Sequence, residues 1–184
     1  MSTPMDAFDD VRPAVERLDL LTGPVAAALR DWRGTEPVER VRYVDTDPDR
    51  ADTAVLVEHY GSWLLEQSAN CVVVAGKRGG AVTLAACVVL AHTRADVNGV
   101  VRRHLGARKA SFAPIETATG ESGMEFGGIT PIGLPEGWPL LVDAAVADAP
   151  HALIGSGSRR GKLIVPGKLL AGLPGAVVLE GLGV

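Results

Sequence analysis

Residues 121–139, ESGMEFGGITPIGLPEGWP, constrain the fold more strongly than any other part of this sequence. Their five glycines and three prolines exclude a regular helix or a long strand, because glycine is conformationally free and proline lacks a backbone donor. Apolar and aromatic side chains alternate through the segment, whereas disordered linkers lack such residues. We therefore expect a shaped, partly buried loop. It is either a structural corner between strands or a loop that holds its backbone close to a small ligand.

The bulk composition is that of one globular domain. A chain of 184 residues with 47% hydrophobic and 22% charged residues can bury a substantial core. Its longest apolar run, residues 84–91, is too short to cross a bilayer, and the acidic N-terminus differs from a secretory signal. We therefore expect a cytoplasmic protein with no membrane partner.

The cysteines and histidines show no pattern of metal ligands. Cys71 and Cys87 both lie in apolar runs, where a free thiol usually behaves as a small buried hydrophobic group. The four histidines have no metal-ligand spacing with each other or with the cysteines. We expect no metal and no other cofactor.

The net charge of −4 conceals an uneven distribution. Acidic residues predominate in residues 1–60, whereas residues 94–109 hold five bases and the single acid Asp96. A second basic group consists of Arg159, Arg160, Lys162 and Lys168. Such groups are ordinarily solvated surface, but they can bind RNA if they share a face.

Apolar residues at helical spacing predict several helices. They cover residues 5–33 with a break at Gly23-Pro24, 53–60, 93 or 96 to 105, 115–120 and 168–173. Strands are expected at 38–44, 70–75, 82–91, 109–112, 140–142, 151–154, 162–165 and 176–179. The unbroken apolar run within 82–91 favours a central strand buried on both faces. Paired strands with inserted helices predict a mixed α/β (α+β) domain.

Three other features are candidate sites of chemistry. The turn IGSG at residues 154–157 lacks the full pattern of a nucleophile turn or a phosphate-binding loop. Asp143 is an acid within an apolar segment, so it must be paired, cap the following turn or have a raised pKa. Lys162 begins the apolar strand KLIV, and it is either a solvated edge residue or a ligand-binding cation.

Two strings, GMEFGGITPIGLPEGWPLLVDAAV and IGSGSRRGKLIVPGKLL, resemble the YbaK/EbsC family of aminoacyl-tRNA deacylases. That family includes the editing domain of bacterial prolyl-tRNA synthetase and its free-standing relatives. The resemblance extends from Thr53 to the C-terminus, and its most specific part matches the family motif Gly-x-x-x-Pro with Gly127-Gly128-Ile129-Thr130-Pro131. It implies one domain over residues 1–184, in which residues 1–52 are a variable N-terminal extension. The implied fold has a curved, barrel-like mixed sheet with surrounding helices.

The resemblance also implies an activity and a set of site residues. Family members hydrolyse the ester that joins a wrong amino acid to the 3′ end of a tRNA, without a metal. The implied partners are the tRNA 3′ end and, as a further candidate, an aminoacyl-tRNA synthetase. The implied catalytic residues are Gly127, Gly128 and Asn70. The implied substrate-binding residues are Ile129, Thr130, Pro131, Gly133, Asp143, Ser156, Gly157, Arg159 and Lys162.

One position departs from the family pattern. Ala69 stands where the family typically has a lysine, and Lys77 lies at the far end of the same expected strand. Lys162 and Arg159 are the candidates to supply the missing cation. Three functions therefore remain open: a hydrolase that edits mischarged tRNA in trans, a module of the same fold that binds tRNA or a small ligand without turnover, and a hydrolase of an unrelated small ester or amide.

Overall fold

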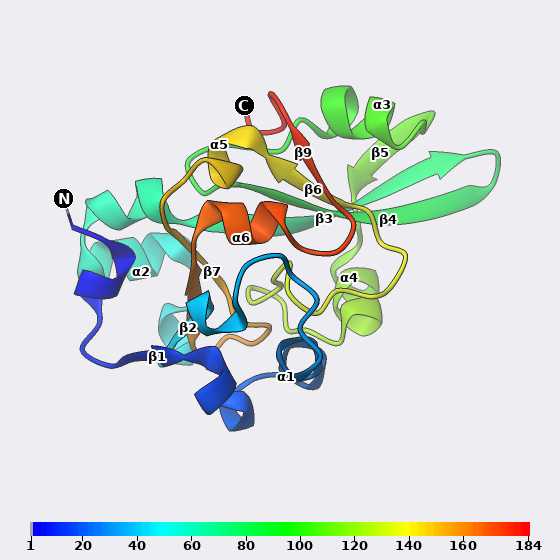
Figure 1. Ribbon diagram of the computed structural model, residues 1–184. Helices are drawn as coiled ribbons and strands as arrows, with labels where there is room; N and C mark the ends of the chain where they lie inside the picture. Colours follow the sequence, from blue (N-terminus) through cyan, green and yellow to red (C-terminus); the bar gives the residue numbers. More distant parts are fainter. Residues whose placement is uncertain (1) are drawn as a thin grey trace.

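The computed structural model describes residues 2–184 as two β-sheets with helices between and around their strands (Figure 1). The strands are β1 Val11–Pro13, β2 Arg42–Val44, β3 Ala69–Arg78, β4 Ala81–Leu90, β5 Lys109–Phe112, β6 Leu140–Asp143, β7 Ala152–Gly155, β8 Lys162–Val165 and β9 Ala176–Leu179. The α-helices are α1 Gly23–Arg30, α2 Thr53–Tyr60, α3 Arg102–His104, α4 Ile115–Ser122, α5 Ala144–Ala147 and α6 Gly167–Ala171. Six 3₁₀ turns and one π-helical segment, Val97–Val101, complete the described elements.

The larger sheet has the strand order β5-β3-β4-β6-β9. Strands β3 and β4 pair antiparallel along their whole length, and the turn between them is formed by Gly79 and Gly80, which both have positive φ. Two consecutive residues with positive φ suit the twist of a two-residue hairpin turn. Strands β4, β6 and β9 run parallel to one another. The interior of β4 is buried on both faces, which confirms the expected central strand.

The smaller sheet has the order β1-β2-β8-β7 and begins with the N-terminal part of the chain. Strand β2 pairs antiparallel with β8, so that Val44 lies opposite Lys162. The two sheets meet at a parallel bridge between Ser68 and Leu153, and the largest hydrophobic cluster lies between them. The mixed α/β class is thus confirmed, while the expected curved sheet is divided into two joined sheets.

The expected helix over residues 5–33 is wrong in its first two thirds. There the chain forms short 3₁₀ turns and the edge strand β1, which ends at Pro13. Proline lacks the donor that a helix interior needs, but it is tolerated on a sheet edge. Gly23-Pro24 does not interrupt a helix; it begins α1, because proline suits the first turn.

Two further boundaries differ from expectation. The strand expected at 38–44 is confined to β2, because Pro37 precedes a 3₁₀ turn over Val38–Arg40. The helix expected to end at Gly106 is a π-helical segment followed by α3, and the Asp96 carboxylate accepts hydrogen bonds from the Gly99 and Val100 amides at its start. Within residues 2–184, no helix is both long and apolar enough to cross a membrane.

Candidate active site

A cavity of about 530 Å³ opens at the junction of the two sheets. The start of β3 forms one wall, and the facing ends of β7 and β8 form another. The start of α2, the loop after α4 and the segment from β5 to α4 complete it. The lining includes Ala51, Asp52, Thr53, Ala69, Asn70, Cys71, Phe112, Phe126, Gly127, Ile129 and Lys162.

The loop at residues 123–139 presents its backbone to this cavity. Gly127 has a φ of 84°, a left-handed conformation that favours glycine, and it lines the cavity together with Ile129. Within residues 2–184, the amides of Gly127 and Ile129 donate no hydrogen bond to another group. These two N–H groups are therefore available to a ligand.

Gly128 has a different task from Gly127. Its amide donates to the carbonyl of Glu125 at 3.0 Å, and its own carbonyl accepts from the amide of Gly157 at 2.7 Å. A Cβ at Gly128 would overlap the backbone carbonyl of Ser158. Gly128 thus joins the loop to the turn after β7, and its amide is not free for a ligand.

Lys162, the first residue of β8, places an ammonium group in the cavity wall. Its residue exposure is only 7%, and Nζ donates to the carbonyl oxygen of Ala51 at 2.8 Å. An ammonium has three N–H donors, and no second acceptor within residues 2–184 is bonded to Nζ. Burial, against the attraction of Asp52, lowers the pKa of Lys162 from its ordinary 10.5 to about 8. At neutral pH the group is therefore still a cation, with donors left for a ligand.

The start of β3 supplies a polar side chain beside this cation. Asn70 is exposed and lines the cavity, and the Thr53 hydroxyl donates to its Oδ1 at 3.4 Å. Ala69, where the resemblance implies a lysine, is buried in the same wall. The structure thus brings Asn70, Gly127, Ile129 and Lys162 together around one space.

Arg159 lies at the edge of the site. Its amide donates to the Glu125 carboxylate at 2.8 Å, and its guanidinium lies 3.7 Å from Asp52 Oδ1. A Cβ built on Gly127 would be 2.7 Å from Arg159 Nη1, so the guanidinium lies against the side of that glycine where a side chain would stand. Arg159 does not line the cavity but borders the part formed by Gly127 and Asp52.

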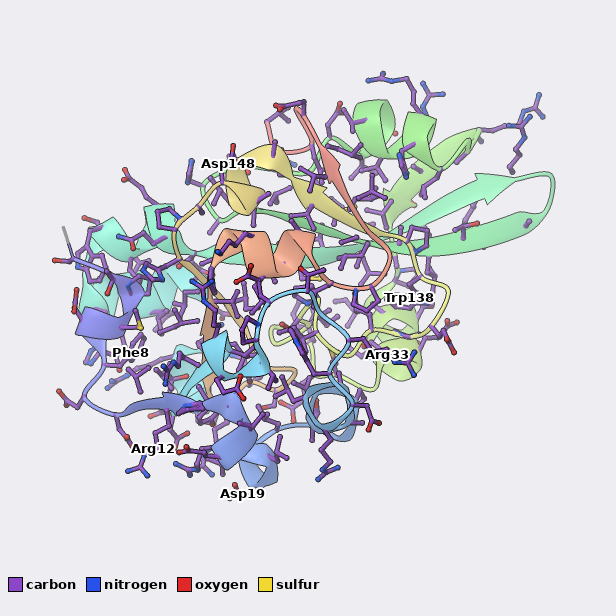
Figure 2. The ribbon with its side chains drawn as sticks, in the orientation of Figure 1. Phe8, Arg12, Asp19, Arg33, Trp138 and Asp148 are labelled. Atoms are coloured by element: carbon purple, nitrogen blue, oxygen red, sulfur yellow. The ribbon has the colours of Figure 1, made fainter. Side chains whose placement is uncertain are left out.

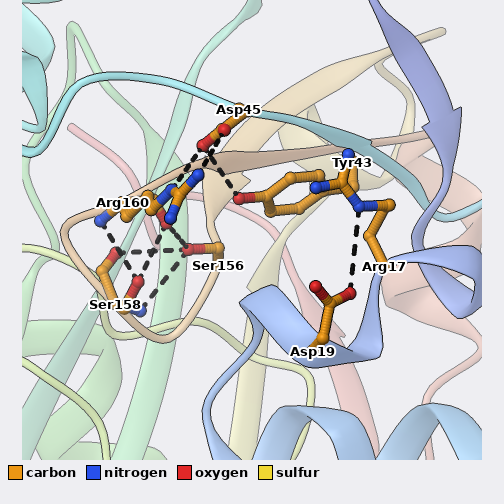
Figure 3. Close-up of polar contacts among 7 residues, drawn as sticks. All are labelled: Arg17, Asp19, Tyr43, Asp45, Ser156, Ser158 and Arg160. Carbon is orange, nitrogen blue, oxygen red and sulfur yellow. Dashed lines mark hydrogen bonds and ion pairs between the residues drawn. The ribbon is translucent and has the colours of Figure 1, made fainter.

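Ser156 stabilises the turn between β7 and β8 (Figure 3), and Gly157 in the same turn is hydrogen-bonded to Glu125 and Gly128 of the loop. Ser156 is fully buried, and its hydroxyl lies 2.8 Å from the carbonyl oxygen of Arg160. The Arg160 guanidinium makes two hydrogen bonds to Asp45, of 2.8 and 2.7 Å, and these hold the pKa of Asp45 below its ordinary value. Burial and the same carboxylate raise the pKa of Tyr43 to about 12. This polar network fixes the turn that carries Arg159.

Seven of the nine expected substrate-binding residues lie outside the cavity lining: Ser156, Gly157 and Arg159 in the turn after β7, and Thr130, Pro131, Gly133 and Asp143. Thr130 and Pro131 are buried behind the loop, and Gly133 packs against the backbone of Pro24 in α1. Asp143 is buried at the end of β6, and a Cβ built on Gly183 would be 2.9 Å from its carboxylate. The structure therefore does not bring Asp143 to the cavity, because β6 lies on the far side of β4 from β3.

Sequence reasoning overlooked the apolar rim of the cavity. Phe112 at the end of β5 and Phe126 in the loop line it, although 54% and 59% of their surfaces are exposed. In a chain with only 4% aromatic residues, two exposed phenylalanines at one opening form a distinct surface. Their signal in the sequence was weak, since exposure cannot be deduced from residue type.

Cys71 is the thiol that lines the cavity. Burial raises its pKa above the ordinary value, so at neutral pH it stays protonated and is a poor nucleophile. Within residues 2–184, no group of three or more His, Cys, Asp or Glu side chains is placed to hold a metal ion. The chemistry that these residues offer is thus a cation, free amides and a carboxamide around a small space.

The sequence and the fold of this chain are similar to those of known proteins. Residues 47–173 match the family model of the aminoacyl-tRNA editing domain. A proposed trans-editing enzyme for prolyl tRNA synthetase has a similar structure, with a TM-score of 0.68 and 21% identity, covering 85% of this chain and 93% of that one. A hypothetical protein of known structure has a TM-score of 0.67 and 19% identity, covering 78% and 91%. Curated proteins gave no match. Since the family model spans more than half of the sequence, this chain belongs to the aminoacyl-tRNA editing domain family.

Proposed function

We propose that this protein is a hydrolase that removes a wrong amino acid from the 3′ end of a tRNA, acting in trans on aminoacyl-tRNA. The main support is the position of Lys162, whose buried ammonium lines the same cavity as the free amide of Gly127. Ester hydrolysis develops negative charge on the carbonyl oxygen, and fixed donors in a water-poor site stabilise that charge. The cation that Ala69 does not provide on β3 comes from β8.

In the proposed reaction the oxygen of a water molecule attacks the ester carbonyl carbon. The bond between that carbon and the ribose oxygen then breaks, and the ribose oxygen takes up a proton from the attacking water. The Lys162 ammonium and the Gly127 amide hold the carbonyl oxygen, and the Asn70 carboxamide holds the amino group of the substrate. The neighbouring ribose hydroxyl places the water, and the volume of the cavity limits which amino acids enter.

The test is the release of amino acid from a panel of mischarged tRNAs by the purified protein. We expect at least one member to be hydrolysed, and we expect Lys162→Met to slow that reaction by about 100-fold or more, the usual effect of losing one donor to an oxyanion. Lys168→Met is the matched control, because Lys168 is an exposed lysine on α6 that pairs with Glu36. Its rate should stay within about twofold of the wild type.

The alternative, a module that binds tRNA without turnover, rests on one observation. Ala69 occupies the position at which the family typically has its lysine. If the wild-type protein released no amino acid from any tRNA of the panel, or if Lys162→Met were as active as the wild type, the proposed hydrolysis at this site would be refuted.

A further inference from the structure

The opposite end of β3 from the cavity carries an unusual surface. Six basic residues gather there from the β3–β4 hairpin, α3, the residue before β5 and the start of β5: Lys77, Arg78, Arg102, Arg103, Arg108 and Lys109. All of them are exposed except Arg102, which is half-buried. Figure 2 shows long, nitrogen-tipped side chains projecting from this end of the molecule. We call these six residues the hairpin cluster.

The hairpin cluster is not neutralised by the rest of the protein. Within residues 2–184, none of its members has a carboxylate within 4.0 Å, whereas Arg12, Arg40 and Arg160 elsewhere all form ion pairs. Arg78 and Arg102 donate instead to backbone carbonyls, those of Gly106 and Asn98. The nearby acid of the sequence, Asp96, is engaged in capping.

Part of this arrangement costs stability. Lys77 on β3 lies directly opposite Lys109 on β5, and like charges at opposite positions of a strand pair repel each other. Lysines on an edge strand can serve to prevent aggregation, which would explain Lys109 on β5. It does not explain Lys77, which lies on the inner strand β3, or the arginines that converge on it.

The hairpin cluster also borders a groove. A second hollow of about 530 Å³ is lined by Lys77, Asn98, Arg102, Arg108, Lys109, Ala110 and Ser111. Ser111 lines this groove and the next residue, Phe112, lines the cavity, so β5 connects the two. From Lys109 to Phe112 the strand extends over about 10 Å. This distance is short enough for a polymer whose end occupies the cavity to reach the hairpin cluster.

We propose that the hairpin cluster and its groove bind the phosphodiester backbone of the RNA whose 3′ end occupies the cavity. The inference rests on the proposed function for the identity of that RNA as a tRNA. An acidic protein needs such a local concentration of positive charge to hold a polyanion, because its overall charge of −4 repels it. The cavity then acts on the ester, and the hairpin cluster supplies affinity.

The test compares two triple variants that make the same change in net charge. K77Q/R108Q/K109Q neutralises half of the hairpin cluster. R12Q/R30Q/R33Q removes three exposed arginines on β1 and around α1, away from the hairpin (Figures 1 and 2). Binding of uncharged tRNA is measured between 50 and 200 mM KCl by fluorescence anisotropy, and thermal unfolding confirms that both variants are folded.

We expect K77Q/R108Q/K109Q to weaken tRNA binding at least about tenfold and to reduce the salt slope by about two to three, roughly one per lost phosphate contact. The control should stay within about twofold of the wild type, and hydrolysis of an aminoacylated trinucleotide should be unchanged in both. Equal losses in the two variants, or no tRNA binding by the wild type, would overturn the inference. Selective loss of binding without any hydrolysis by the wild type would support the inference and refute the proposed function instead.

Discussion

The two ends of strand β3 use positive charge in opposite ways. At its start, beside Asn70, a single ammonium from Lys162 is buried and bonded to the Ala51 carbonyl. At its end lie the six cations of the hairpin cluster, five of them exposed and Arg102 half-buried, and none has a carboxylate within 4.0 Å among residues 2–184. Burying a charge costs free energy unless the charge is paired or hydrogen-bonded, and a buried charge interacts strongly over a short range. Exposed charges are individually weak but act together on a polyanion, and salt screens them.

The backbone differs between the two ends in the same sense. The cavity end is closed by hydrogen bonds between the loop and the turn after β7, through Glu125, Gly128 and Gly157. The hairpin end has a two-glycine turn in open space, where a Cβ at Gly79 or Gly80 would meet nothing within 4 Å. The backbone is thus fixed by tertiary hydrogen bonds at the cavity end, and the hairpin turn has no such constraint. Hydrolysis in the cavity requires donors at fixed positions, whereas electrostatic binding of RNA at the hairpin cluster does not.

The largest expected effect on stability comes from disrupting the contact between the loop and the turn after β7 at the cavity end. Gly128→Ala places a methyl group on the Ser158 carbonyl, so we expect the free energy of unfolding to fall by about 3 kcal/mol. Gly120→Ala in α4 is the matched control, since it meets no atom within 4 Å and should gain about 0.5–1 kcal/mol. Urea denaturation measures both. Similar stabilities for the two variants would show that the loop and turn are not joined as described.

The rate of hydrolysis should depend on pH, because the cavity end of β3 contains Lys162, a lysine with a strongly lowered pKa. If the Lys162 ammonium is required, hydrolysis should fall about tenfold per pH unit above its pKa of about 8. The rate is measured from pH 6.5 to 9.5 after subtraction of spontaneous ester hydrolysis, with Lys168→Met as control. A rate that rises through pH 8 would instead assign Lys162 the role of a neutral base.

The same group affects stability in the opposite direction. Between pH 8 and 10.5 the unfolded chain holds a proton on Lys162 that the folded protein has released. Since the unfolded state binds more protons there, the stability of the folded state rises with pH across that window. The stability difference between Lys162→Met and the wild type should therefore change across that window, and a constant difference in denaturation midpoint would contradict the lowered pKa.

The smallest effect is expected at the exposed ion pair near the cavity. Asp45→Asn removes the bidentate partner of Arg160, but both side chains are about half exposed. Such pairs contribute up to about 1 kcal/mol, so the variant should lose no more than that in thermal denaturation. Its hydrolytic rate should be unchanged, because Arg160 does not line the cavity. A large loss of activity would show that the geometry of the cavity depends on this pair.

Local patterns in the sequence predicted most of the fold. The apolar runs of β3 and β4 and the loop at residues 121–139 all carry their signal within a few neighbouring residues. The prediction of an N-terminal helix was wrong because it used only the local spacing of apolar residues. The chain there forms β1, whose pairing with β2 depends on residues about 30 positions away. Long-range pairing is not encoded in any local pattern.

The site was less predictable for the same reason. Lys162 was singled out as a candidate, and the structure places it in the cavity lining, but its burial results from β8 pairing with β2 and from the Ala51 carbonyl, both distant in sequence. The basic residues of 94–109 were recognised as a candidate RNA surface, whereas their convergence with Lys77 required the β3–β5 register. Asp143 showed the converse: its apolar neighbours suggested a special role, and the fold placed it away from the cavity.

We expect the two ends of β3 to have separate functions, catalysis at the cavity and RNA binding at the hairpin cluster. This separation of functions is tested most directly by measuring rate and affinity on one variant of each end. The single-turnover rate of deacylation at saturating protein and the dissociation constant for tRNA are determined for Lys162→Met and for K77Q/R108Q/K109Q. We predict that Lys162→Met loses rate by about 100-fold and keeps its affinity, while the triple variant loses affinity about tenfold and keeps its rate. If rate and affinity fell together in both variants, the two ends of β3 would not have separate functions.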